Sequence, residues 1–211
     1  MITLFKKTPI SLAASLGAMI AWEAFSAPQV FDFKDPKGVN NAVFKLDAPL
    51  ESINGTANGI SGTITYDPAE PNALTGRITV AAASLHVPNP LMKEHLHGPN
   101  WLDVSRHQEI TFESRKVSNV KTSGTDATAD VTGILTIKGL SKELTVPVRF
   151  TYLKDKLGAR SNGQMQGDLL VVRSTFKIKR TDFAINPQAP TDKVAEDIEL
   201  VLSLAGAAPR R

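Results

Sequence analysis

Residues 59–68 read Gly59-Ile60-Ser61-Gly62-Thr63-Ile64-Thr65-Tyr66-Asp67-Pro68, and this stretch decides the fold that the sequence predicts. Apolar and polar side chains alternate along it, as in a half-buried β-strand, and Asp-Pro ends it with a turn. The same alternation returns at Arg77–Ser84 and Glu109–Ser114, and a polar, histidine-bearing insertion separates these two segments. We therefore expect a meander of antiparallel strands that is interrupted by a lid.

Working outward, nearly every segment keeps the two-residue period and is bounded by turn residues. Further strands are expected near Val39–Asp47, Val131–Ile137, Leu144–Phe150, Leu169–Arg180 and Ile198–Leu204. About eight strands in sequence predict an all-β fold, an eight-stranded antiparallel barrel, because closure removes exposed sheet edges. A two-sheet sandwich is the alternative. Small residues at Ala82 and Gly133 predict free space inside the barrel.

The two ends of the chain differ from this central pattern. Residues 1–26 predict a signal peptide that is removed on export, because Lys6 and Lys7 precede the apolar run Ile10–Trp22. That run is shorter than the roughly 18–20 residues that span a bilayer, so we expect no permanent membrane anchor. The mature protein is expected to be periplasmic or extracellular. Residues 27–205 are expected to form a single β-barrel domain, and residues 206–211 a flexible tail.

Composition excludes several classes of function. The chain has no cysteine, which excludes disulfides, a thiol nucleophile and thiolate metal ligands. A formal net charge of +3, without a basic run that interleaves with aromatics, argues against nucleic-acid binding. The sequence has neither a glycine-rich phosphate loop nor a G-x-S-x-G motif. We therefore expect no cofactor and no enzymatic activity.

Four blocks of the sequence resemble the YceI-like family of exported, lipocalin-like proteins that are associated with isoprenoid quinones, polyprenyl chains and related amphiphilic lipids. The blocks are Gly59–Pro68, Lys93–Leu96 with Trp101–Val104 and Ile110–Ser114, Gly133–Val146, and Phe176–Ile185. Trp101-Leu102, His107-Gln108 and Ala184 depart from the residues that are frequent in the family.

The resemblance implies non-enzymatic binding, carriage or sequestration of an amphiphilic isoprenoid-type lipid in an apolar barrel cavity. The ligand would be a quinone, a polyprenyl or a fatty acyl species. The positions expected to face it are those that alternate inward on the predicted strands, although a slip of one residue would exchange the two faces. They are Ile64, Tyr66, Ile78, Val80, Phe112, Leu135, Val146, Val148, Phe176 and Ile178.

Residues Pro90–Val104 are expected to form a short helical lid at one end of the barrel. Prolines at both ends of this segment prevent it from continuing the flanking strands. Leu91, Leu96 and Trp101 are expected to turn apolar surface toward the ligand, and His95 or His97 to hydrogen-bond its head group.

Two other functions stay open on the sequence. All four histidines, His86, His95, His97 and His107, fall within one short window, and imidazole is a common metal ligand, so a metal-binding or enzymatic protein is one alternative. The other is an exported scaffold with a filled barrel that binds another protein. The sequence also leaves a homodimer possible.

Overall fold

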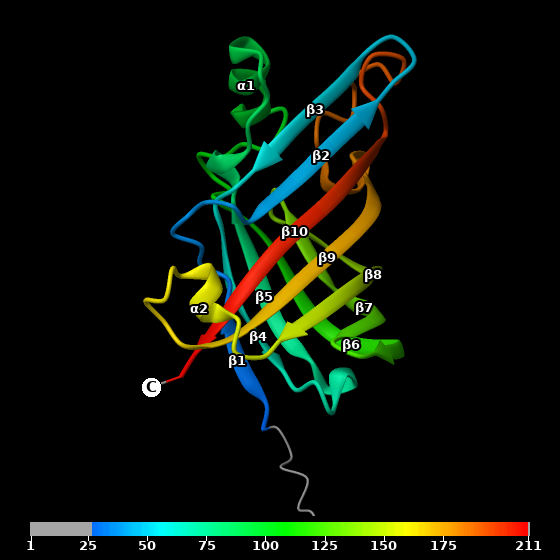
Figure 1. The fold of residues 1–211 in the computed structure, drawn as a ribbon. Helices are drawn as coiled ribbons and strands as arrows, with labels where there is room; N and C mark the ends of the chain where they lie inside the picture. Colours follow the sequence, from blue (N-terminus) through cyan, green and yellow to red (C-terminus); the bar gives the residue numbers. More distant parts are fainter. Residues whose placement is uncertain (1–26, 211) are drawn as a thin grey trace, which may run out of the picture.

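The computed structural model describes residues 27–210, and the predicted signal peptide therefore lies outside the described residues. The chain forms ten strand segments in one sheet (Figure 1). They are β1 (Gln29–Asp32), β2 (Asn41–Asp47), β3 (Ser52–Ala57), β4 (Ile60–Tyr66), β5 (Thr75–Ala81), β6 (Glu109–Ser123), β7 (Asp126–Ile137), β8 (Leu140–Leu153), β9 (Gly167–Lys179) and β10 (Asp197–Pro209).

The ten segments make up an eight-stranded closed antiparallel barrel. β4 to β10 follow one another around the sheet, and β1 closes it by pairing with both β4 and β10, where Asp32 lies opposite Ala207. β2 pairs with β10 farther along the same edge, and β3 pairs with β2. Segments β1 and β2 thus form one interrupted barrel strand, and β3 and β4 form the next. The predicted all-β, lipocalin-like barrel of eight strands is confirmed.

A side chain bridges the interruption between β1 and β2. The Asn40 amide donates through Nδ2 to the Ala205 carbonyl (3.2 Å), and its Oδ1 accepts the Ala205 N–H (2.8 Å). Ala205 lies on β10 between the residues that pair with β1 and those that pair with β2. The side chain therefore makes the two hydrogen bonds that a strand residue would make there.

The predicted flexible tail is wrong for residues 206–209. β10 continues through Pro209, and Gly206–Pro209 pair with Gly167–Leu170 of β9. Glycine is favoured at position 206 because the Phe33 ring fills the space beside it: a Cβ on Gly206 would lie 2.6 Å from that ring. The absence of a side chain at this position is thus a packing requirement.

Helices are few and short. α1 (Pro90–His97) forms the first part of the lid segment Pro90–Val104, with Asn89 capping its start by accepting the Met92 N–H (3.1 Å). α2 (Leu157–Arg160) lies in the connection between β8 and β9. Three 3-10 turns, η1 (Pro71–Ala73), η2 (Ala82–Ser84) and η3 (Thr181–Phe183), mark the ends of strands. No helix within residues 27–210 has the length and apolar character needed to cross a membrane.

Candidate functional site

An apolar cavity of about 190 Å³ lies inside the barrel. Its walls come from β2 to β10, from the lid and from Leu85 and Ile185, and none of the lining side chains is charged. An apolar cavity of about 150 Å³ is already enough for a benzene-sized molecule, so this space is sufficient for a segment of hydrocarbon.

Most of the predicted ligand-facing residues line this cavity. Ile78, Val80, Phe112 and Phe176 are only partly buried although they point inward, because they border the cavity. Eleven of the fourteen predicted positions lie in its wall, namely Ile64, Ile78, Val80, Leu96, Trp101, Phe112, Leu135, Val146, Val148, Phe176 and Ile178.

Three predicted positions do not line the cavity. Leu91 is 60% exposed and His95 is exposed as well, so the lid turns both of them toward solvent. Leu91 and Leu96 are five residues apart on α1, which places them about 140° apart around the helix, so only one of them can face the barrel. Tyr66 points inward but is 2% exposed, and its ring stacks on Phe150 at 5.8 Å.

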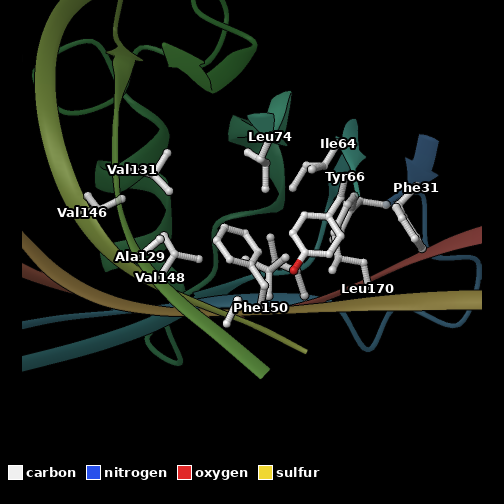
Figure 2. Packing of buried hydrophobic residues seen from close by; sticks show 14 of the residues in the cluster. Phe31, Ile64, Tyr66, Leu74, Ala129, Val131, Val146, Val148, Phe150 and Leu170 are labelled. Carbon is white, nitrogen blue, oxygen red and sulfur yellow. The ribbon is translucent and has the colours of Figure 1, made fainter. Parts of the chain in front are cut away.

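Tyr66 belongs to an aromatic plug that closes one end of the barrel. Phe31, Phe33, Tyr66 and Phe150 are almost completely buried there, and Phe31 meets Tyr152 edge-on at 6.3 Å. Figure 2 shows Tyr66 and Phe150 side by side, with Leu170 close to Tyr66. The plug fills the interior at this end and leaves the cavity in the rest of the barrel.

The predicted explanation for the free space is wrong in detail. A Cβ on Gly133 would lie 2.6 Å from the Phe112 ring, so that ring already occupies the space beside this glycine. Ala82 lies in η2, outside the cavity wall. The cavity is instead lined mainly by Ile, Val and Leu side chains of the strands.

Sequence reasoning missed a whole wall of the cavity. Four residues of β10, Ile198, Leu200, Leu202 and Leu204, line it, as do Phe44 and Leu46 of β2. The signal was present, because both segments alternate apolar and polar residues. The sequence did not show that β2 and β10 are neighbours on the cavity wall.

The cavity offers a ligand almost no polar partner. Its only hydroxyl side chains are Ser114 and Ser174. Ser114 Oγ accepts the Gly76 N–H (2.8 Å) and donates to the Gly76 carbonyl (3.2 Å), and Ser174 Oγ donates to the Pro147 carbonyl (2.7 Å). Both hydroxyls are engaged by the wall itself. A polar head group inside would lose its hydrogen bonds to water without replacement.

The lid and a buried arginine cover the other end of the barrel. Leu96, Trp101 and Leu102 line the cavity from the lid side. Arg180, fully buried, donates to the Ile185 carbonyl (2.9 Å) and lies 3.7 Å from the Glu196 carboxylate. Arg180 thereby fixes the loop that presents Ile185 to the cavity.

The histidines have separate environments. His97 Nε2 lies 2.8 Å from the Leu85 carbonyl, and the His107 ring lies over Gly139. His86 and His95 are exposed. Within residues 27–210, no group of three or more His, Asp or Glu side chains is placed to hold a metal ion.

A polar cluster surrounds the plug on the outside. Asp168, 4% exposed, accepts hydrogen bonds from Tyr152 (2.7 Å), Gln29 (3.1 Å) and Arg210 (3.2 Å). Burial, together with the hydrogen bond to Asp168, raises the pKa of the Tyr152 hydroxyl above its usual range. The cluster fastens the C-terminal strand to the closed end and does not reach the cavity.

The YceI-like domain model matches residues 35–205. The chain belongs to the YceI-like family. Among curated relatives, a UPF0312 protein of Azotobacter vinelandii is 28% identical over 96% of this chain and 98% of its own. A UPF0312 protein of Ectopseudomonas mendocina is 29% identical over 90% of this chain and 92% of its own.

Solved structures share the fold of this YceI-like chain. BcnA of Burkholderia cenocepacia has a TM-score of 0.64 at 22% identity and covers 79% of this chain and 95% of its own. A polyisoprenoid binding domain from Saccharophagus degradans, implicated in plant cell wall breakdown, has a TM-score of 0.62 at 9% identity. The match covers 86% of this chain and 99% of that domain's chain. At these identities the likeness concerns the fold.

Proposed function

We propose that this YceI-like protein is exported and binds the hydrocarbon chain of an amphiphilic isoprenoid-type lipid, without performing chemistry on it. The observation that carries the proposal is the cavity: its lining is apolar, and its two hydroxyls are occupied by the wall. Each methylene that enters such a cavity contributes about 0.8 kcal/mol, so a chain binds well without polar contacts. The polyisoprenoid-binding domain of Saccharophagus degradans, which has a similar fold, supports this choice of ligand class.

The direct test is the content of the protein when it is purified from the envelope of its own host. Native mass spectrometry and organic extraction should recover a stoichiometric isoprenoid or acyl lipid. Ala42→Phe places a ring in the cavity wall and should reduce the lipid occupancy. Ala83→Phe adds the same ring at an exposed site and should leave occupancy unchanged. An empty wild-type protein that also fails to take up farnesol in vitro would contradict the proposal.

A further inference from the structure

The cavity ends at a defined depth inside the barrel. The last inward row that lines it spans three neighbouring strands, and its members are Phe150 of β8, Val172 of β9 and Leu204 of β10. The next inward row on the same strands, two residues closer to the plugged end, does not line it and consists of Tyr152, Leu170 and Gly206. We call the first of these rows the floor row, because the free space stops there.

Two further strands also stop lining the cavity before they reach the plugged end. On β4, Ile64 lines the cavity, but Tyr66, two residues farther along the same face, does not. On β7, Val131 lines it, but neither Ala129 nor Ala127 does. Residues two apart on a strand point to the same side of the sheet, so these breaks are not changes of face. The interior itself is filled beyond this depth.

The aromatic plug is what fills it. Of the four plug residues, only Phe150 lines the cavity. Its ring stacks on Tyr66, with ring centroids 5.8 Å apart and 27° between the planes, as Figure 2 shows. Leu170 and Phe33 are fully buried, and the Phe33 ring occupies the space beside Gly206. Phe150 is therefore the plug residue that a molecule in the cavity would contact.

Hydrogen bonds hold the plug in place. The Phe33 N–H donates to the Gly62 carbonyl (2.9 Å), and the Phe33 carbonyl accepts a hydrogen bond from Asn40 Nδ2 (3.0 Å). In the row behind the floor, the Tyr152 hydroxyl donates to the Asp168 carboxylate (2.7 Å). Moving the plug aside would break these bonds and leave buried polar groups unpaired, which is costly. The fold therefore fixes the depth of the cavity.

Chain length is the property by which such a cavity can distinguish one hydrocarbon from another. Its two hydroxyls, Ser114 and Ser174, are bonded to the wall, so affinity depends on how much of the chain is buried. Each methylene that enters raises the affinity about fourfold. A chain that already reaches the floor leaves any further methylenes in water, where they add nothing to the affinity. The preferred chain is the one whose length matches the depth of the cavity.

We propose that Phe150, supported by Tyr66, determines which length of hydrocarbon chain the protein prefers. The tail of the chain contacts the Phe150 ring. The polar end of the molecule lies toward the lid, where Trp101 lines the cavity and is itself partly exposed to solvent. This inference rests on the proposed function, because it assumes that a hydrocarbon chain occupies the cavity. It adds the residue that sets the upper limit of chain length.

A mixture of alcohols tests the preferred length. The protein is incubated with equimolar saturated 1-alkanols from decanol to eicosanol, and native mass spectrometry identifies those that it retains. The wild-type protein should retain a narrow range of lengths. Phe150→Ala removes the ring from the floor row, so an alcohol longer than the wild-type optimum should be enriched at least fourfold, the gain for about one further methylene. Phe150→Leu disturbs the core less and should shift the preference in the same direction by a smaller amount.

Phe44→Ala is the matched control. Phe44 also lines the cavity, but it lies on β2 and packs in the cluster that includes the lid residues Leu96 and Trp101. Loss of its ring removes as many atoms from the lining as Phe150→Ala does, yet it widens the cavity near the lid and does not deepen it. The preferred alcohol should therefore stay the same. Circular dichroism of each variant verifies that the barrel is folded.

The outcomes separate this inference from the proposed function. If the wild-type protein retains neither farnesol nor any alkanol, the proposed function fails. If it retains farnesol but shows no length preference among the alkanols, or if both Phe150 variants keep the wild-type preference, the plug does not set the length and the proposed function still stands. If Phe44→Ala shifts the preference as far as Phe150→Ala, the total volume of the cavity decides the length, and the assignment to Phe150 is wrong.

Discussion

At position 40, an amide side chain takes the place of strand backbone. Asn40 is 2% exposed and its side chain also donates to the Phe33 carbonyl at 3.0 Å, so all of its side-chain hydrogen bonds serve the junction of β1, β2 and β10. Asparagine is suited to this role because its amide presents one acceptor and two donors, as the Ala205 N–H and two carbonyls require.

Asn40→Ala should lower the free energy of unfolding by about 2–4 kcal/mol, because it leaves buried backbone groups at Ala205 and Phe33 unpaired. Urea denaturation followed by circular dichroism measures this. The control is Asn41→Ala, whose amide bonds only to the Val39 carbonyl, and it should cost less than about 1 kcal/mol. Equal losses in both variants would contradict the role of Asn40.

Asp35 organises the same loop through its charge. Burial opposes its ionisation, but hydrogen bonds from the Asn40, Lys37 and Val39 N–H groups and the Arg160 charge outweigh burial and lower the pKa of the carboxyl. A lowered folded-state pKa stabilises the protein above the unfolded-state value of about 3.8. That stability is lost as the pH falls through the folded-state pKa.

Asp35→Asn should therefore destabilise the protein at pH 7, and the difference from wild type should shrink as the pH falls below the ordinary aspartate pKa. Thermal unfolding of both proteins between pH 7 and pH 2.5 measures it. A penalty of the same size across that range would show that the charge of Asp35 contributes nothing.

Among the elements, the lid contributes to the cavity through one of its faces. Trp101→Ala removes a ring that lines the cavity and should weaken lipid binding by more than about 1 kcal/mol while the barrel stays folded. Leu91→Ala on the exposed face of α1 is the matched control and should leave the affinity unchanged. Isothermal calorimetry with farnesol gives both values. Reduced thermal stability with unchanged affinity would mean that Trp101 only plugs the barrel.

The elements also show how far the sequence could predict the structure. Alternation on β7 and β9 correctly placed Leu135 and Ile178 on the cavity side, because a two-residue period ties each side chain to one face. The break between β1 and β2 could not be predicted, since it depends on a contact between Asn40 and Ala205, far apart in sequence. For the same reason the aromatic plug was missed: Phe31 and Phe150 meet only after closure.

For the molecule as a whole, closure depends on the last residues of β10. Removing residues 206–211 should destabilise the barrel by about 3 kcal/mol or more, at about 1 kcal/mol for each lost ladder hydrogen bond. It also removes Ala207, which pairs with Asp32. Removing residue 211 alone is the control, and urea denaturation compares the two. A shortened protein as stable as the control would show that the strand is dispensable beyond Ala205.

The pairing of Asp32 with Ala207 also has a kinetic consequence. Nearly the whole described chain lies between these residues, so the barrel cannot close before its C-terminal strand has been synthesised. Folds that depend on such distant contacts form slowly compared with those built from local ones. For a protein that we propose to be exported, this delay is an advantage. An exported chain would stay unfolded while it crosses the membrane, and would complete its fold only after β10 has arrived on the far side.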